Sequence, residues 1–123
     1  MIKGIGVDII EIDRIKVSIE TYGKSFIDKF FTANEIEYCS KKANPFQHFA
    51  ARFAAKEAVS KALSTGWSGE FRWHDFEVTN DKLGKPYFTI YGALKLSLEN
   101  CNIQLSLSHS DKTVVAFVVI EEK

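Results

Sequence analysis

The stretch FAARFAAKEAVSKAL (Phe49–Leu63) decides the fold of this chain. It contains no Gly or Pro and consists mainly of Ala, Lys, Glu, Leu and Arg, which are strong helix formers. Glu57 and Lys61 are four residues apart, so they share one face of the predicted helix. Arg52 and Lys56 form a second such pair on another face. A helix so rich in Ala packs closely against its neighbours, and these charges therefore mark either a solvated face or a functional site.

Length and composition predict a single globular domain that spans residues 1–123. A chain of this size buries about two-thirds of its unfolded surface, and 46% hydrophobic residues with ten Phe argue against disorder. The 16 basic and 16 acidic side chains balance, which is unlike a nucleic-acid-binding protein. Cys39 and Cys101 match no metal-ligand spacing and are expected to be reduced thiols. Because the N-terminal segment resembles neither a signal peptide nor a membrane span, we expect a cytoplasmic protein without a membrane partner.

The N-terminal segment Ile2–Ile10 is predicted to be a strand, because it is rich in β-branched residues. Gly4 and Gly6 interrupt it, and glycines inside a strand suggest the close approach of another backbone or of a ligand. Asp8 follows them among β-branched neighbours. A carboxylate buried there needs a partner, of which a cation is the simplest. The alternative is that Asp8 ends the strand or caps the helix that follows.

The remaining segments predict an α+β fold, with helices packed on a mainly antiparallel sheet. Gly and Pro positions, a Thr32–Glu35 capping box and hydrophobic periodicity predict helices at 13–22, 25–31, 32–42 and 92–100, with Asn44-Pro45 breaking the chain before the central helix. They predict strands at 73–79, 86–91, 103–107 and 114–120, of which the first two form a hairpin. The nearly continuous apolar run at 114–120 is typical of a strand buried on both faces.

Two carboxylates from separate elements and a lysine suit a hard divalent cation that holds a phosphate group. Mg²⁺ favours one or two carboxylates together with several waters and substrate oxygens. Asp8 and Glu57 would supply the carboxylates. Lys61 and Arg52 would offset the remaining phosphate charge. Spacing alone does not bring Asp8 and Glu57 together, and the alternative is a solvated Glu57–Lys61 helix pair of modest energetic value.

Two separated motifs carry a more specific signal. They are GIGVDIIEIDRI at 4–15 and RFAAKEAVSKA at 52–62, and in their order and spacing the chain resembles the bacterial holo-acyl-carrier-protein synthase family of 4′-phosphopantetheinyl transferases. The likeness extends to FTxxE at 31–35, GKPY at 84–87 and LSLSHS at 105–110. The chain departs from the family pattern at Ser64, where a glycine is expected. The loop from Trp67 to Trp73 is also less typical, and its effect on the cofactor or a neighbouring subunit stays open.

The resemblance implies transfer of phosphopantetheine from coenzyme A to a serine of apo-acyl carrier protein, with release of adenosine 3′,5′-bisphosphate, in support of fatty acid biosynthesis. Asp8 and Glu57 would hold Mg²⁺ at the coenzyme A diphosphate, and Lys61 would neutralise that diphosphate. The serine proton would pass either to Glu57 or to a water on the metal. Arg52 is expected to bind a coenzyme phosphate through its planar guanidinium.

Further residues gain roles from the same resemblance. Lys85, Pro86 and His109 would surround the adenosine and its 3′-phosphate, although His109 is alternatively a turn histidine bonded to neighbouring serines. Arg14 would contact the acidic helix of the carrier, where complementary charge speeds encounter and fixes register. Lys16 and Lys24 are weaker candidates for the contact with the carrier. His48 and His74 are expected to be structural or surface residues.

The family forms a homotrimer through its sheet, with the active site between adjacent subunits, and we expect the same assembly here. Two rival functions stay open. One is a different Mg²⁺-dependent enzyme, such as a small phosphodiesterase, that uses the same two carboxylates. The other is a non-catalytic module that binds the carrier or coenzyme A. Retention of Asp8, Glu57 and Lys61 argues against the second rival.

Overall fold

The computed structural model describes residues 1–64 and 70–123. The predicted turn at 65–69, and with it part of the atypical loop before Trp73, lies outside the described residues. In chain order the elements are β1 (Ile2–Glu11), α1 (Ile12–Tyr22), α2 (Lys24–Phe30), α3 (Ala33–Ser40), α4 (Pro45–Ala62), the 3₁₀ turn η1 (Trp73–Asp75), β2 (Phe76–Asn80), β3 (Pro86–Ile90), α5 (Ala93–Ser97), β4 (Cys101–His109) and β5 (Thr113–Glu122).

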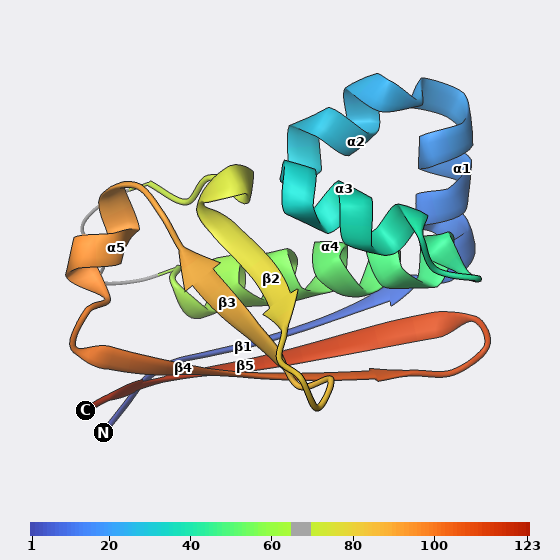
Figure 1. Ribbon diagram of the computed structural model, residues 1–123. Coiled ribbons are helices and arrows are strands. Elements are labelled where there is room, and N and C mark those ends of the chain that lie inside the picture. The colour runs from blue at the N-terminus through green and yellow to red at the C-terminus, as the bar shows by residue number, and fades with distance from the viewer. Residues whose placement is uncertain (65–69) are drawn as a thin grey trace.

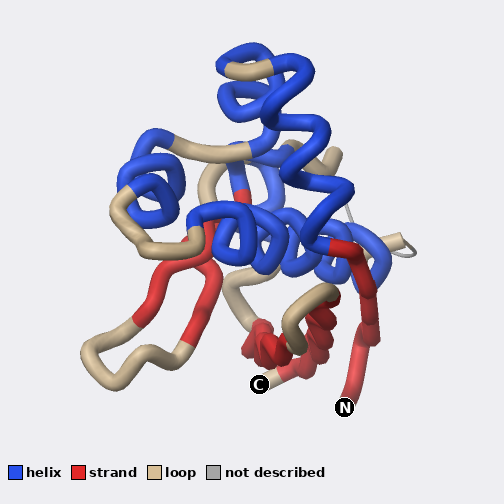
Figure 2. The backbone as a smooth tube through the Cα atoms, turned by 90° about the vertical axis from the view of Figure 1, so that its right-hand side faces the viewer, coloured by secondary structure: helices blue, strands red, loops and turns tan. Residues whose placement is uncertain are grey.

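Helix α4 lies at the centre of the fold (Figure 1). Strands β1, β5 and β4 form an antiparallel sheet in the order β1-β5-β4, and α4 crosses one face of it, mainly over β1 and β5. Helices α1, α2 and α3 lie on the other side of α4, and the β2–β3 hairpin stands beside it. Seen from the side, the two chain ends lie at the same edge of the sheet (Figure 2). The predicted α+β fold is confirmed.

The backbones of β1 and α4 approach each other closely at the two glycines. A Cβ atom on Gly4 would lie 2.2 Å from the carbonyl oxygen of Ala62, and one on Gly6 would lie 1.8 Å from that of Ala58. Real Cβ atoms do not approach oxygen so closely, so only glycine fits at these positions. The prediction of a close approach at Gly4 and Gly6 is confirmed, and the partner is a helix backbone.

Several predicted boundaries are wrong. Helix α4 begins at Pro45, earlier than Phe49, because proline at the first helical position lacks only an N–H that has no intrahelical partner there. The segment 73–75 is a 3₁₀ turn, and the strand predicted from Trp73 begins at Phe76. The helix predicted at 92–100 is confined to α5. Asp8 neither ends β1 nor caps α1, since the strand continues to Glu11, which is the N-cap residue.

Strand β5 alternates between a buried face and an open one. Val114, Ala116, Val118 and Ile120 are buried beneath α4, whereas Phe117 is 39% exposed. On the neighbouring strand, Ile5, Val7 and Ile9 pair with Val119, Phe117 and Val115 and are each more than half exposed. Within the single chain, the apolar 114–120 strand is therefore buried on one face only. We call this side the open sheet face: Ile5, Val7, Ile9, Val115, Phe117 and Val119.

Two local predictions are confirmed in detail. The Thr32 hydroxyl accepts from Glu35 N (3.2 Å) and the Glu35 carboxylate accepts from Thr32 N (2.9 Å), which completes the capping box at the start of α3. Cys39 and Cys101 are free thiols. Burial raises the pKa of the Cys39 thiol to about 12, so Cys39 is an inert core residue. No helix in the described parts of the chain is long and apolar enough to cross a membrane.

Candidate active site

Asp8 and Lys61 form an ion pair where β1 and α4 approach. The Lys61 ammonium donates to Asp8 Oδ1 (2.9 Å) and to the carbonyl oxygen of Val7 (3.2 Å). The glycine contacts with Ala58 and Ala62 make this reach possible, because they bring the C-terminal half of α4 against β1. Among the described residues, Lys61 forms its ion pair with Asp8. The alternative, a Glu57–Lys61 pair along the helix, does not form between these described side chains.

Glu57 completes this group, which we call the carboxylate cluster: Asp8, Glu57 and Lys61. Burial and, next, the negative charge of Asp8 raise the pKa of Glu57, while the charges of Lys61 and Arg14 oppose the rise. Lys61, which pairs with Asp8, lies one turn after Glu57 on the same face of α4. The fold therefore places Asp8 and Glu57 on the same side of α4 although they are far apart in sequence.

The carboxylate cluster has the composition of a site for a divalent cation that also binds substrate oxygens. Two carboxylates suit Mg²⁺, which takes one or two carboxylates and completes its shell with waters and phosphate oxygens. Within residues 1–64 and 70–123 no three His, Cys, Asp or Glu side chains gather into a self-sufficient metal centre. The donor set thus fits a metal shared with a phosphate ligand better than a permanently held structural ion.

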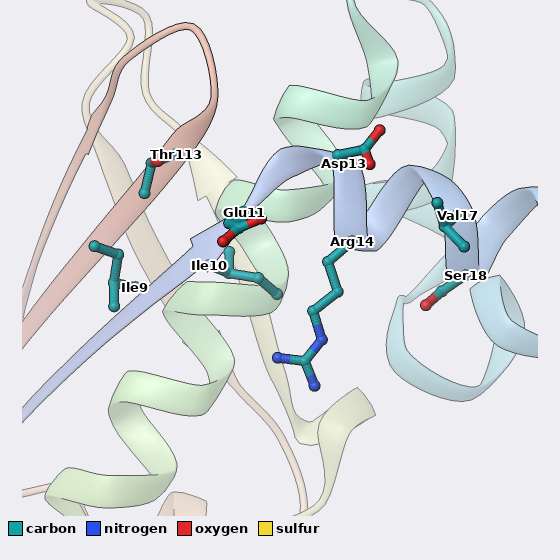
Figure 3. A pocket seen from close by; sticks show the side chains of 8 residues that line it. All are labelled: Ile9, Ile10, Glu11, Asp13, Arg14, Val17, Ser18 and Thr113. Atoms are coloured by element: carbon teal, nitrogen blue, oxygen red, sulfur yellow. The ribbon is translucent and has the colours of Figure 1, made fainter.

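Arg14 lies at the rim of a shallow groove between the end of β1 and α1. Figure 3 shows its guanidinium extended well beyond the α1 ribbon, and the side chain is exposed. The other basic candidates on this side are already engaged: the Lys16 ammonium lies 5.7 Å from the Phe46 ring centre, and Lys24 forms an ion pair with Asp28. The groove has a volume of about 640 Å³ and is lined by Ile9, Ile10, Glu11, Asp13, Arg14, Val17, Ser18 and Thr113.

A second cavity, of about 270 Å³, gathers three of the residues predicted to bind coenzyme A. We call it the histidine pocket, and it is lined by Tyr38, Gln47, His48, Ala51, Arg52, Asn80, Gly84, Pro86, Leu107, Ser108, His109 and Val114. Of the predicted residues, Arg52, Pro86 and His109 line it, whereas Lys61 and Lys85 do not. Lys85 is exposed in the β2–β3 turn, where its backbone N–H donates to Asp81 Oδ1 (2.9 Å).

Arg52 is the deepest polar residue of the histidine pocket and is only 2% exposed. Its Nη2 donates to Asn80 Oδ1 (2.7 Å), and the guanidinium carbon lies 4.1 Å from the centre of the Tyr38 ring. Its Nε has no hydrogen-bond partner among the described residues. A buried guanidinium with an unused N–H is unusual unless a ligand supplies the acceptor.

Two histidines face this pocket, and the sequence predicted only one of them. His109 ends β4, and Ser110 bonds Thr113 N (3.3 Å) instead, so no described contact supports the alternative of a His109 held by its neighbouring serines. His48, expected from sequence to be structural or on the surface, lines the same pocket. Burial and then the charge of Arg52 lower the pKa of His48. His74 lies elsewhere, with Nε2 2.6 Å from the Asp28 carbonyl oxygen.

The histidine pocket and the carboxylate cluster lie on different sides of α4. Arg52 and Glu57 are five residues apart, which places them roughly 140° apart around the helix axis. The charges that shift the Glu57 pKa come from Asp8, Lys61 and Arg14 and none from the pocket. A single chain therefore does not unite all the predicted site residues in one cavity.

The sequence and the fold both match one family. The sequence model of the 4′-phosphopantetheinyl transferase superfamily matches residues 4–118, and the chain belongs to that superfamily. Among its relatives, the holo-[acyl-carrier-protein] synthase of Solibacter usitatus is 48% identical and covers 98% of this chain and 99% of its own. The holo-[acyl-carrier-protein] synthase of Ruminiclostridium cellulolyticum is 51% identical, over 94% of this chain and 90% of its own.

Solved structures agree with these relatives. The crystal structure of holo-[acyl-carrier-protein] synthase from Neisseria meningitidis has a TM-score of 0.89 and 38% identity, and the match covers 99% of this chain and 100% of that one. The synthase from Bacillus anthracis, crystallised in complex with CoA (3′,5′-ADP), has a TM-score of 0.82 and 38% identity, with 100% and 99% covered. The resemblance inferred from the two motifs is confirmed.

Proposed function

We propose that this protein transfers the 4′-phosphopantetheine group of coenzyme A to a serine hydroxyl of apo-acyl carrier protein and releases adenosine 3′,5′-bisphosphate. The observation that carries the proposal is the carboxylate cluster, in which Lys61 of α4 pairs with Asp8 of β1 and Glu57 lies one turn before Lys61 on the same helix. The relatives named as holo-[acyl-carrier-protein] synthases support the same reaction. We place this activity in the cytoplasm, in support of fatty acid biosynthesis.

The residues of the carboxylate cluster would divide the chemical work. Asp8 and Glu57 would hold Mg²⁺, which when bound offsets the negative charge of the coenzyme A diphosphate. Lys61, already beside Asp8, offsets further charge as the leaving group departs. The serine oxygen bonds to the phosphorus next to pantetheine, and the bond from that phosphorus to the bridging oxygen breaks, so adenosine 3′,5′-bisphosphate leaves with the electron pair. Either Glu57 or a water on the metal would accept the serine proton.

The histidine pocket is our candidate site for the adenosine 3′-phosphate end of coenzyme A. Arg52 offers a buried N–H without a partner among the described residues, His109 and Pro86 line the same cavity, and Lys85 adds a positive charge in the neighbouring turn. We expect His109→Ala to weaken coenzyme A binding about tenfold, the scale of one hydrogen bond to a charged group. Calorimetric titration with coenzyme A tests this. His74→Ala, which removes a histidine outside the pocket, is the matched control, and equal affinities for the two variants would exclude His109 from the site.

Arg14 is our candidate contact for the acidic carrier protein. The net charge of the chain is zero, so steering of the carrier must come from a local patch. We expect Arg14→Ala to raise the KM for the carrier about tenfold, to leave the KM for coenzyme A unchanged, and to flatten the dependence of the rate on salt. Lys24→Ala, whose side chain is already paired with Asp28, should have a smaller effect. A salt profile identical to that of the unmodified protein would contradict this docking proposal.

We further propose that the protein works as a homotrimer assembled through the open sheet face. Exposed apolar patches of this kind mark interaction surfaces, and a site shared between subunits would bring the histidine pocket of one chain to the carboxylate cluster of another. Sedimentation equilibrium measures the assembly directly. A monomer at micromolar concentration, with full activity, would contradict the shared site.

Intact-mass spectrometry tests the reaction itself. Apo-acyl carrier protein is incubated with this protein, coenzyme A and Mg²⁺, with an EDTA control. We expect the carrier to gain the mass of one phosphopantetheine arm and the gain to disappear with EDTA. Nucleotide released without any carrier would favour a phosphodiesterase, whereas no gain and no nucleotide with several apo carriers would favour a non-catalytic binding module.

A further inference from the structure

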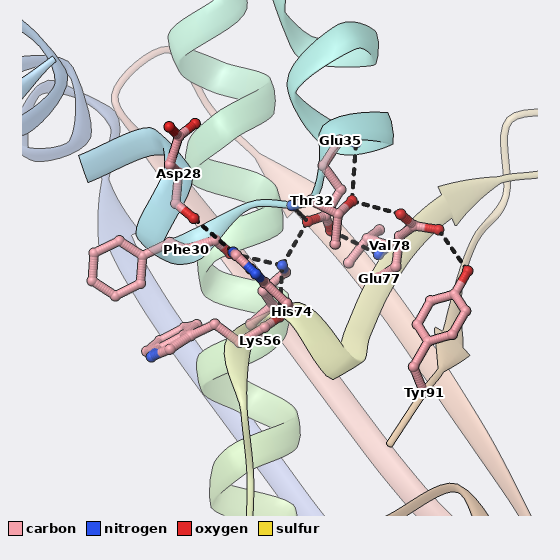
Figure 4. A network of polar contacts seen from close by, with 10 residues as sticks. Asp28, Phe30, Thr32, Glu35, Lys56, His74, Glu77, Val78 and Tyr91 are labelled. Atoms are coloured by element: carbon pink, nitrogen blue, oxygen red, sulfur yellow. Dashed lines mark hydrogen bonds and ion pairs between the residues drawn. The ribbon is translucent and has the colours of Figure 1, made fainter. Parts of the chain in front are cut away.

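Lys56, the residue before Glu57, is buried in the protein interior and is fully bonded there. Its side chain is 0% exposed, and its ammonium donates to the carbonyl oxygens of Phe30 (2.7 Å) and Trp73 (2.9 Å) and to Glu35 Oε1 (2.5 Å). An ammonium has three protons, and each has an acceptor. Figure 4 shows these bonds converging on Lys56 from separate elements. This side chain is therefore fixed in one position.

The partners of Lys56 are themselves held in place. Glu35 is also fully buried and accepts from Thr32 N (2.9 Å) and Val78 N (2.8 Å). Glu77 extends the network by accepting from the Thr32 hydroxyl (2.5 Å) and the Tyr91 hydroxyl (3.3 Å). Lys56 thus connects α4 to the α2–α3 junction, to η1 and to the β2–β3 hairpin. A buried ion pair is weak evidence for stability, and its best attested use is to select one arrangement of the elements.

This network holds the side of α4 that faces away from the sheet. Successive helical residues are about 100° apart, so Lys56 and Ala58 lie on nearly opposite sides of α4 and Glu57 lies between them. Ala58 is held against β1 at Gly6. With both sides fixed, α4 cannot rotate about its axis, and Glu57 stays on the face of the helix from which Lys61, one turn later, reaches Asp8 on β1.

The same anchors also fix the wall beside Glu57. Phe53 lies one turn before Glu57 on the same face of α4. Its ring is held between Phe30 (centroids 5.2 Å apart, edge-on) and Trp73 (5.3 Å, stacked), the two residues whose carbonyl oxygens accept from Lys56. One lysine therefore controls both the helix and the aromatic rings next to the carboxylate cluster.

We infer that Lys56 is a positioning residue for the transfer reaction: through its three hydrogen bonds it fixes the rotation of α4 and thereby aims Glu57 at Asp8. The inference rests on the proposed function, because it gives Glu57 and Asp8 a shared metal to hold. Lys56 itself touches neither the substrate nor the metal in this role. It acts through the geometry of the two carboxylates.

The test compares Lys56→Met with the unmodified protein in two measurements. The first is the Mg²⁺ concentration that gives half-maximal transfer, which we expect to rise about tenfold. The second is calorimetric coenzyme A binding with and without Mg²⁺. We expect affinity without Mg²⁺ to be unchanged and the gain produced by Mg²⁺ to be lost. Both quantities report on the folded enzyme when they are measured well below the melting temperature of Lys56→Met, where little of the protein is unfolded.

Two further variants separate positioning from general destabilisation. Glu35→Gln keeps the shape of the network but removes its negative charge, and it should shift the Mg²⁺ requirement in the same direction as Lys56→Met. Leu98→Ala removes a core side chain that is 3% exposed next to α5, and it should lower the melting temperature without changing the Mg²⁺ requirement. An unchanged Mg²⁺ requirement in both network variants, or an equal shift in Leu98→Ala, would overturn the inference. Absence of Mg²⁺-dependent transfer in the unmodified protein would instead refute the proposed function.

Discussion

Glu57→Gln should reduce phosphopantetheine transfer by about 10³-fold or more, and yet it should make the metal-free protein more stable to heat at neutral pH. The loss follows because the glutamine cannot hold a divalent cation as a carboxylate does and cannot accept the serine proton. The gain follows because burial and the neighbouring charge of Asp8 disfavour the ionised form of Glu57. Removing that charge relieves the repulsion. Transfer is measured by intact mass and stability by thermal unfolding in EDTA.

The pH dependence of this stability gain has a definite sign. The pKa of Glu57 is raised in the folded chain from its ordinary value of 4.5, so the folded state binds the proton more tightly than the unfolded state does. Well below pH 4.5 the side chain is neutral in both states and carries no penalty. The penalty grows as the pH rises from 4.5 to the folded pKa and is complete above the folded pKa. The melting temperature of Glu57→Gln should therefore exceed that of the unmodified protein at about pH 7 and match it near pH 4.

Two variants serve as controls for the Glu57 prediction. Hydrogen bonding and the charge of Lys41 lower the pKa of Glu37, so Glu37→Gln should give no stabilisation at neutral pH and leave transfer intact. Asp8→Ala should abolish transfer without stabilising the chain, because it leaves Lys61 without its ion-pair partner. Near-normal transfer by Glu57→Gln or Asp8→Ala would refute the assigned metal site. A lower melting temperature of Glu57→Gln at neutral pH would refute the repulsion between the two carboxylates.

The sequence predicted the parts of the site that depend on local chemistry. A pair of glycines in a β-branched strand implied a close backbone contact, and the structure supplies the contact at Ala58 and Ala62. The capping box depends on four consecutive residues and could also be predicted from the sequence. The placement of Asp8 relative to Glu57 could not be predicted from the residue pattern, because it depends on how β1 and α4 pack, and spacing along the chain does not determine that packing. There the family resemblance, rather than the residue pattern, supplied the prediction.

The burial of Arg52 and Lys56 was missed for a physical reason. Their spacing along α4 resembles that of an exposed charged pair, and an exposed helix would place such charges in water. Helix α4 is instead covered by the sheet on one side and by helices and the β2–β3 hairpin on others. Hydrophobic periodicity identifies a helix that buries one apolar face. It does not identify a helix, such as α4, whose charged residues are also covered by neighbouring elements. The sequence offered one indication of this burial, the charged residues among small alanines, and that pattern fitted either a solvated face or a functional site.

Strand β5 shows a different limit of the sequence. Its residues are apolar at nearly every position, which is typical of a strand buried on both faces, but periodicity does not distinguish a subunit interface from the core of one chain. The chain itself covers only the side beneath α4, and Phe117 stays 39% exposed on the other. Sequence reports that a face is apolar but not whether the same chain or another molecule covers it. The proposed trimer is the consequence that we draw from that difference.

Gly6→Ala should have the largest effect on the fold of any single substitution in β1. The added methyl group would lie 1.8 Å from the carbonyl oxygen of Ala58, and neither the strand nor the helix backbone can move away as a flexible side chain would. Inserting a methyl group into a packed core typically costs about 1–3 kcal/mol, and a backbone obstacle places this change at or above the upper end. We expect a fall in melting temperature of about 10 °C or more, measured by calorimetry.

Gly23→Ala is the matched control, because it separates steric conflict from backbone strain. Gly23 has φ = 57° and ψ = −132°, and a methyl group added to it would have no atom within 4 Å, so alanine there meets only the strain of a backbone conformation that favours glycine, about 1–3 kcal/mol. Gly6→Ala should be clearly the less stable of the two. An equal melting temperature for both variants would contradict the close β1–α4 contact.

The Gly6 substitution also links the fold to the site. Asp8 lies two residues beyond Gly6 on β1, and Lys61 reaches it only because the helix is in contact with the strand. Any relaxation that accommodates a methyl group at Gly6 must increase the separation between β1 and α4 and hence between Asp8 and Glu57. The fraction of Gly6→Ala that folds should therefore need more Mg²⁺ for transfer, whereas Gly23→Ala should not. Wild-type Mg²⁺ dependence in folded Gly6→Ala would show that the two carboxylates do not depend on this contact for their geometry.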